Sequence, residues 1–149
     1  MFKKVLEYAG SYRKITYAAA AVLLVGVVMS VLPYWFIYLL IRPLLLGGPL
    51  TVETAVSATV AIAVCGVLHA LLYVKGLSLS HRAAYQTLKN LRLSLQKRLE
   101  QQPLGAIQEK GVGVWKKMFI DDIESIELLL AHALPEGIAN LAVPVFIFL

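Results

Sequence analysis

The chain has 149 residues, of which 59% are hydrophobic and only 15% are charged, with a formal net charge of +5 and a mean hydropathy of +0.74. Soluble globular domains carry about 25% charged residues, so neither an ordinary soluble enzyme domain nor a disordered tail fits this composition. The single cysteine, Cys65, excludes an internal disulfide framework and a cysteine-based zinc site.

Three runs of the chain lack charged side chains: residues 15–41, 54–74 and 137–149. The first two correspond to helices of about 40 and 31 Å, against a hydrocarbon core of about 30 Å, and therefore predict two membrane spans. The alternatives are a buried helix of a large soluble protein and, for the first run, a signal peptide. The apolar region of a signal peptide is only about 7–15 residues long, and this run is followed by Arg42 and Pro43 rather than by a cleavage site.

The basic residues predict the orientation of these spans. Thirteen of the fourteen Lys and Arg residues precede the first span or follow the second, and only Arg42 lies in the outer loop expected at 42–53. The positive-inside rule then places that side, with the N-terminus, in the cytoplasm. We expect a multi-pass protein of the plasma membrane (the bacterial inner membrane). Because topology explains the net charge, the lipid bilayer is an expected partner and nucleic acid is not.

Residues 1–14, which precede the first span (15–41), form an amphipathic segment. We predict an interfacial elbow helix that lies in the headgroup layer, with a frayed terminus as the alternative.

Beyond Lys75 the second apolar run becomes polar but keeps a helical apolar period as far as Glu100. The simplest prediction is one helix over 54–100, about 70 Å long, that crosses the membrane and extends about 39 Å into the cytoplasm. Gly76 is the weak point of this prediction, since glycine costs about 1 kcal/mol relative to alanine in a helix. Two helices broken at Gly76 are the alternative.

Residues 101–120 are punctuated by Pro and Gly and are expected to form an intracellular loop with a short helix over 114–120. Trp115, Met118 and Phe119 would then be exposed at the tip of a long projection, which is typical of a docking surface. The alternative is that these side chains fold back onto neighbouring helices.

A third helix is expected over 121–149, with Asp121 as its N-cap and Glu124 completing a capping box. One apolar ridge is predicted along it, formed by Ile123, Ile126, Leu130, Leu134, Ile138, Leu141 and Val145. If this helix enters the membrane near residue 138, only about 17 Å of helix remains, which reaches mid-bilayer. We therefore expect the chain to be a fragment of a longer protein, cut inside its third span.

The sequence contains no phosphate-binding glycine loop, dinucleotide motif, H-E-x-x-H or cysteine pair, so no catalytic, cofactor or metal site is expected in this segment. Cys65 and His69 could share a helix face, but the better interpretation of His69 is a neutral histidine bonded to a neighbouring helix. His81 lies in the polar stalk, where we expect it to be solvated. His132 and Glu136 are four residues apart and are expected to pair, as a functional candidate if they lie near the membrane.

The region from the second to the third helix resembles the first intracellular region of ATP-binding-cassette (ABC) transporters of exporter type. The matching residues are 91–99, Pro103-Leu104, Gly113 and the apolar-acidic repeat over 122–127, and Gly113 to Asp122 has the family spacing of nine residues. The sequence departs from the family in having Gln102 before Pro103, where Leu is usual, and 108–110 where a Phe-Asp pair is often found slightly earlier.

This resemblance implies an all-α membrane protein, the N-terminal part of a six-helix transmembrane domain. Such a domain would couple ATP binding and hydrolysis in a nucleotide-binding domain to substrate translocation by alternating access. Partners would be a nucleotide-binding domain, in the same chain or separate, and a second transmembrane domain as a homo- or heterodimer; ATP and Mg²⁺ would bind outside this segment. The first coupling helix would use Val114, Trp115, Met118, Phe119 and Asp122. A substrate cavity would be lined by Tyr34, Tyr38, His69 and Tyr73.

Two other functions are alternatives for a chain with these spans. A two-span sensor would use residues 75–100 as a signalling coiled coil, but the outer connection is short and the third helix re-enters the membrane. A small scaffold or assembly protein, complete at 149 residues, conflicts with a helix that ends in mid-membrane.

Overall fold

The computed structural model describes residues 7–133 and 135–148, which form helices and turns and no strand. The elements in chain order are η1 (Gly10–Tyr12), α2 (Arg13–Leu45), α3 (Val52–Glu100), α4 (Leu104–Lys110), α5 (Val112–Lys117), η2 (Met118–Asp122), α6 (Ile123–Leu128), η3 (Leu129–Ala133) and α7 (Pro135–Phe148). The turn η1 is a 3-10 turn, and η2 and η3 are π turns. The predicted all-α class is confirmed.

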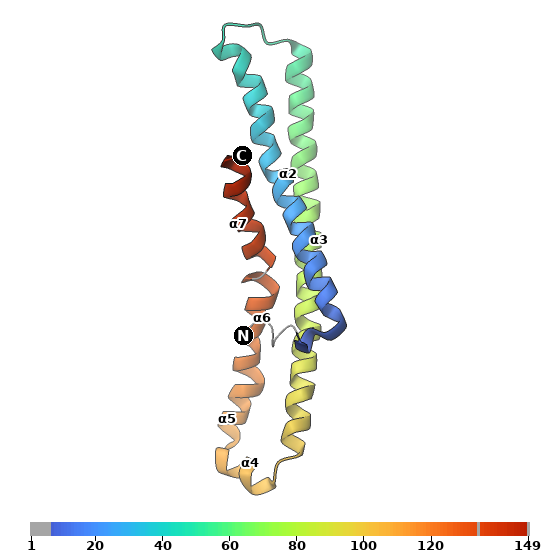
Figure 1. Cartoon of the computed structure of the whole chain (residues 1–149), viewed down its shortest axis with the longest axis vertical. Helices are drawn as coiled ribbons and strands as arrows, with labels where there is room; N and C mark the ends of the chain where they lie inside the picture. The colour runs from blue at the N-terminus through green and yellow to red at the C-terminus, as the bar shows by residue number, and fades with distance from the viewer. Residues whose placement is uncertain (1–6, 134, 149) are drawn as a thin grey trace.

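The two long helices α2 and α3 run antiparallel and set the length of the molecule (Figure 1). Residues 46–51 join them at one end, and α4 and α5 form the tip at the other end. Both α2 and α3 are long and apolar enough to cross a membrane, with mean hydropathies of 2.4 and 2.2 over their most apolar windows. The predicted runs 15–41 and 54–74 lie inside them.

Helix α3 begins where Thr51 caps it, because the Thr51 hydroxyl accepts a hydrogen bond of 3.2 Å from the backbone N–H of Thr54. It then continues for 49 residues, about 74 Å, to Glu100. The helix is unbroken at Gly76, so the single-helix prediction is correct and the two-helix alternative is wrong.

Gly76 is needed because α2 crosses α3 at that point. A Cβ atom at position 76 would lie 2.6 Å from Cγ of Leu23, 2.8 Å from its Cδ2, and 3.4 Å from the carbonyl oxygen of Ala19. Leu23 is only 2% exposed and packs with Val27 and Ala139, so it has little room to move away. The glycine therefore serves close packing rather than a helix break.

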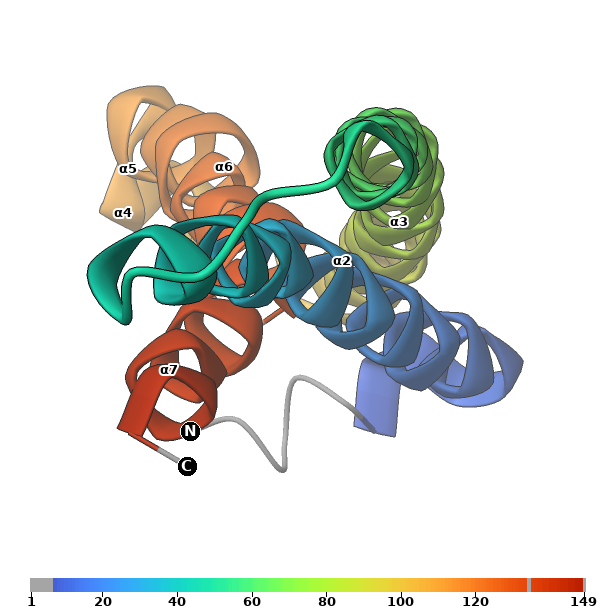
Figure 2. The same cartoon turned by 90° about the horizontal axis from the view of Figure 1, so that it is seen from above.

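Gly76 opens a buried row of small side chains on α3, which we call the small-residue face. Its members recur every three or four residues: Gly76, Ser80, Ala83, Ala84 and Thr87. Helix α2 meets this face at Gly76 through Leu23, and η3 meets it at Ser80 and Ala84. Helix α6 also contacts α3. Beyond η3 the chain moves away from α3, and α7 packs against α2 instead (Figures 1 and 2).

The π turn η3 is held to α3 by the hydroxyl group of Ser80. This buried hydroxyl donates a 2.7 Å hydrogen bond to the carbonyl oxygen of Ala131 and lies 3.3 Å from that of Leu130. In a regular α-helix the carbonyl oxygen of Ala131 would accept from the backbone N–H of residue 135, but that residue is Pro135, which has no N–H. Ser80 thus supplies the donor that Pro135 lacks.

The predicted apolar ridge of the third helix is only half right. Its first part is buried on α3, with Ile123 at 4% and Leu130 at 3% exposure, but Leu141 and Val145 are 74% and 57% exposed. Leu134 and the side chain of Ile138 lie outside the described residues. A π turn holds about one residue more than an α turn, which advances the following side chains by about 100°.

As a result of that phase change, α7 turns a different pair of side chains toward α2. Ala139 is buried against Leu23 and Val27, and Val143 packs against the same cluster. The ridge prediction assumed one uninterrupted α period, and the π turn at residues 129–133 broke that assumption.

The start of the third helix also differs from the prediction. The break in the chain is at Gly111, whose φ of +77° favours glycine, and helical structure then runs from Val112 through η2 into α6. Asp121 lies inside η2, so the predicted N-cap and capping box are wrong. The residues before Asp121 are already helical, so no helix begins at that residue.

The elbow expected at 1–14 is only partly described, since residues 1–6 lie outside the described residues. Residues 7–9 are helical, η1 follows, and Gly10 has a φ of +54°. This segment is attached to α3, because the side-chain amide of Asn90 donates a 3.1 Å hydrogen bond to the carbonyl oxygen of Tyr8. Ala9 is 1% exposed at the same contact region.

We expect Gly76→Ala to destabilise the protein by about 1–3 kcal/mol, because the added methyl group must displace the packed Leu23 side chain. The matched control is Gly66→Ala on the same helix, where a Cβ atom meets nothing within 4 Å. That control should be neutral or stabilising by up to about 1 kcal/mol. Thermal unfolding of both variants in detergent measures the difference, and equal melting temperatures would contradict the packing role of Gly76.

Candidate functional site

The tip of the molecule is a small hairpin made of α4 and α5, joined at Gly111 (Figure 1). Trp115 holds the two helices together, because its indole N–H donates a 3.0 Å hydrogen bond to the carbonyl oxygen of Ile107. The ammonium group of Lys110 lies over the same ring, 5.3 Å from its centroid. Trp115 is therefore a brace inside the hairpin.

Two contacts shape the chain that follows α5. The side chain of Arg92 on α3 donates a 3.4 Å hydrogen bond to the carbonyl oxygen of Phe119. The Lys117 ammonium lies 3.7 Å from the carboxylate of Asp122, an ion pair that spans η2 and in which both side chains are mostly exposed. The tip is thus joined to α3 by the backbone at Phe119 and by the connection at residues 101–103.

The apolar side chains exposed at the tip are not the ones the sequence indicated. Trp115, Met118 and Phe119 are half-buried rather than freely exposed, and Trp115 folds back onto α4, as the alternative expected. The large apolar side chains exposed on α4 and α5 are Leu104 at 70%, Val112 at 84% and Val114 at 50%. Of these residues, only Val114 was predicted to belong to the coupling surface. Leu104 and Val112 directly follow Pro103 and Gly111, and an apolar residue next to a turn-forming residue is the signal that could have identified them.

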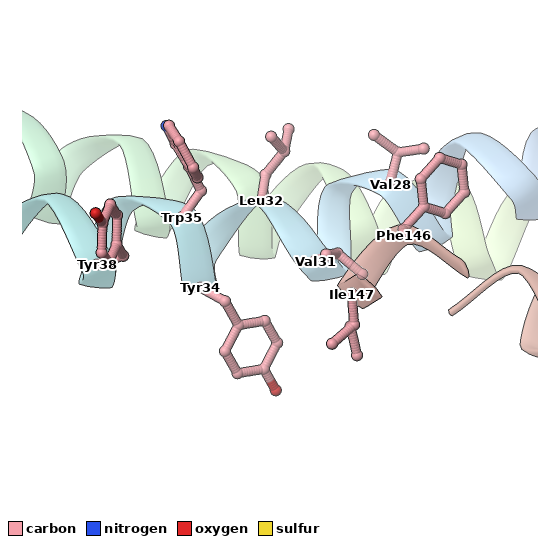
Figure 3. Close-up of a pocket in the computed structure, with 8 residues that line it drawn as sticks. All are labelled: Val28, Val31, Leu32, Tyr34, Trp35, Tyr38, Phe146 and Ile147. Atoms are coloured by element: carbon pink, nitrogen blue, oxygen red, sulfur yellow. The ribbon is translucent and has the colours of Figure 1, made fainter. Parts of the chain in front are cut away.

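A second candidate site is a hollow of about 720 Å³ beside α2, near the end of α7 (Figure 3). Its lining is apolar and aromatic and comes from both helices: Val28, Val31, Leu32, Tyr34, Trp35, Tyr38, Phe146 and Ile147. The rings of Trp35 and Tyr38 lie 5.6 Å apart and are tilted by 38°. The structure thus brings together the two predicted cavity residues on α2, Tyr34 and Tyr38, and adds Trp35.

The other two predicted cavity residues, His69 and Tyr73, do not line this hollow. His69 Nδ1 lies 2.8 Å from the carbonyl oxygen of Gly26 on α2, and since that oxygen can only accept, Nδ1 is the donor. The prediction that His69 bonds a neighbouring helix is confirmed. Tyr73 lies one turn further along α3, with its ring centroid 6.1 Å from that of His69 and its side chain 41% exposed.

A histidine pair lies between α3 and η3. The rings of His81 and His132 meet edge to face with centroids 4.8 Å apart, and His132 Nδ1 lies 2.9 Å from a carboxylate oxygen of Glu136. The predicted pairing of His132 with Glu136 is confirmed. The prediction that His81 is solvated is only half right: the residue is partly exposed, but its Nδ1 is buried and has no hydrogen-bond partner in the described part of the chain.

These side chains do not make a metal centre. Within residues 7–133 and 135–148, no group of three or more His, Cys, Asp or Glu side chains is placed to hold a metal ion. Cys65 is a buried free thiol, and His69 is directed to Gly26.

Residues 15–149 match the model of a family described as the ABC transporter transmembrane region. A curated relative is the Mycobactin import ATP-binding/permease protein IrtA of Mycobacterium tuberculosis, to which the chain is 38% identical over 55 residues. That alignment covers 37% of this chain and 6% of the relative, so the chain spans only a small part of the length of the relative it matches.

We expect Trp115→Phe to loosen the α4–α5 hairpin, because phenylalanine keeps a ring beside Lys110 but cannot donate to the Ile107 carbonyl. A hydrogen bond worth about 0.5–1.5 kcal/mol corresponds to a roughly two- to tenfold rise in hairpin opening. Limited trypsin digestion at Lys110 measures this rise. Trp35→Phe, in the hollow beside α2, is the matched control and should leave the cleavage rate unchanged; equal rates in both variants would contradict the brace.

Proposed function

This chain belongs to the family of ABC transporter transmembrane regions, and we propose that it forms the N-terminal part of one such membrane domain. In this proposal the domain couples ATP binding and hydrolysis in a nucleotide-binding domain to substrate translocation by alternating access. The observation that carries the proposal is the braced hairpin at the tip of the long α3 projection, about 74 Å of helix away from the opposite loop.

The hairpin has the properties of a docking element for a partner domain. It presents exposed apolar side chains, Leu104, Val112 and Val114, on a support stiffened by Trp115. Met118 and Phe119 act from behind this surface, since they are half-buried. Asp122 and its ion pair with Lys117 complete the coupling element at the point where η2 leads into α6.

The path from the tip to the hollow runs through the third helix. Elements α5, η2, α6, η3 and α7 follow one another from the hairpin to Phe146 and Ile147, which line the hollow beside α2. A displacement of the hairpin is thereby passed along a continuous set of helices to a candidate substrate wall. Tyr34, Trp35 and Tyr38 form the aromatic side of that wall.

The family and the charge distribution give the remaining parts of the proposal. The tip is cytoplasmic, as the N-terminus is, because the basic residues gather on that side of the two spans. ATP and Mg²⁺ bind to the nucleotide-binding domain, and the exposed apolar face of α3, including Val56, Val60 and Val64, is left for lipid or further helices of a paired transmembrane domain.

The test measures coupling without knowledge of the substrate. In the full-length protein, freed of other cysteines by changes that include Cys65→Ala, Tyr38→Cys reports access to the hollow through its maleimide labelling rate. ATP with vanadate should change this rate several-fold in the parent. We expect Val112→Ser with Val114→Ser to weaken docking about tenfold and to abolish the change while ATP hydrolysis continues.

The matched control is Leu128→Ser, which alters a 67% exposed apolar side chain on α6, about 24 Å of helix from Val112. This variant should keep the response of the reporter to ATP and vanadate. The docking assignment fails if the double variant keeps the full response, or if Leu128→Ser loses it equally.

A further inference from the structure

A second, smaller cleft lies at the tip of the molecule, where the end of α3 meets the α4–α5 hairpin (Figure 1). Its volume is about 240 Å³, and its apolar lining includes Leu99, Ala106 and the ring of Trp115. Sites for small-molecule ligands measure about 300–1,000 Å³. The cleft lies below that range and has room for one inserted side chain or a small ion.

The polar lining of this cleft consists of two cations and an amide, so we call it the basic cleft. Arg98 comes from α3, Gln102 from the turn that follows it, and Lys110 from the end of α4. The Lys110 ammonium lies 5.3 Å from the centroid of the Trp115 ring, which holds this charge at the cleft. The basic cleft therefore offers positive charge and N–H donors to a group that enters it.

The neighbouring carboxylates do not neutralise the basic cleft. Glu100 accepts a 2.9 Å hydrogen bond from the side-chain amide of Gln96, one turn back along α3, and Glu109 is exposed. Neither glutamate lines the cleft. In the described part of the chain, neither Arg98 nor Lys110 forms an ion pair with a carboxylate. A negative charge that matches this cleft must therefore come from another molecule or domain.

The level of the basic cleft along α3 puts it out of reach of lipid headgroups. The lining begins at Leu95, which is about 30 Å of helix beyond Lys75, where the uncharged run of α3 ends. The headgroup layer extends only about 5–8 Å beyond each side of the hydrocarbon core. The cleft instead belongs to the hairpin that carries the exposed apolar side chains of α4 and α5.

We propose that the basic cleft receives an aspartate or glutamate side chain of the nucleotide-binding domain that docks on the hairpin. This inference rests on the proposed function, which supplies the partner, and adds the chemistry by which that partner is recognised. The carboxylate accepts hydrogen bonds from the Arg98 guanidinium and the Lys110 ammonium, while its methylene groups contact Leu99 and Ala106. Such a charged contact fixes the register of docking, and the apolar side chains beside it supply buried area.

The test uses the Tyr38→Cys reporter in the full-length protein freed of other cysteines. Arg98→Gln with Lys110→Gln removes both cations of the cleft and keeps polar side chains in their place. We expect docking to weaken about tenfold and the response of the reporter to ATP with vanadate to be lost while ATP hydrolysis continues. Raising KCl from about 0.05 to 0.5 M should weaken the parent response in the same direction, because salt screens the exposed cations.

The matched control is Lys97→Gln with Lys116→Gln. It removes two exposed positive charges from the same tip, one on α3 and one on α5, and neither residue lines the cleft. This variant should keep the reporter response. The proposal is refuted if the cleft variant keeps the full response, or if the control loses it equally, since the effect would then come from net charge alone.

Occupancy of the cleft is measured with Ala106→Cys in place of the reporter, labelled by the anionic probe sulfonatoethyl methanethiosulfonate. We expect Val112→Ser with Val114→Ser to speed this labelling several-fold, because undocking withdraws the partner side chain. Equal rates in both backgrounds would show that no partner group fills the cleft. Labelling that is slowed only by added inorganic phosphate would assign the cleft to a small free anion, and either result overturns the proposal.

Failure of this inference is distinguishable from failure of the proposed function. If Val112→Ser with Val114→Ser abolishes the Tyr38→Cys response and the cleft variant keeps it, docking on the hairpin stands and the carboxylate assignment is wrong. If both variants keep the response, the docking function itself fails, and the basic cleft loses its partner with it.

Discussion

Helix α2 and the third helix can both pack on α3 because its buried face between Gly76 and Thr87 carries no side chain larger than threonine. Close approach of α2 needs the bare backbone at Gly76, and close approach of η3 needs the small hydroxyl of Ser80 and the methyl groups of Ala83 and Ala84. The course of α2 and of the third helix depends on this contact. Helix α3 fixes the direction of α2 toward the outer loop, and it fixes the point at which the third helix turns away from α3 toward α2.

The same contact divides the molecule into two working halves. Below it, α3 and the third helix form a polar stalk that ends in the braced hairpin at Gly111 and Trp115. Above it, α2 and α7 line an open aromatic hollow. The third helix is the element that belongs to both halves, and its π turn lies at the division. An interaction that changes the α3–η3 contact therefore changes the geometric relation between tip and hollow.

Much of this arrangement could be predicted from the sequence, because it rests on hydrophobic length and charge. The two long uncharged runs and the apolar period beyond Lys75 indicated helices that the structure contains in α2 and α3. The i, i+4 spacing of His132 and Glu136 predicted their pairing. These features are local in the chain, so pattern analysis reaches them.

The errors arose where contacts distant in sequence override the local pattern. Asp121 has the residue type of an N-cap, but the helix had already begun at Val112. Trp115 is a residue type that is common at exposed docking surfaces, but its indole N–H donates a hydrogen bond to the carbonyl oxygen of Ile107. No period in the sequence shows that Ser80 lies beside Ala131, some fifty residues away. The hydrogen bond between them stabilises the π turn at that place.

The surplus residue in η3 also affects how this chain should be aligned with its relatives. Because the π turn absorbs one residue that an α helix would not need, a relative with one residue fewer between 128 and 134 would present the same side chains to α2 beyond that point. We expect single-residue gaps within this turn to be compatible with an unchanged fold. A gap placed anywhere in α6 or α7 to improve an apolar match would instead turn Ala139 and Val143 away from the helix they pack on.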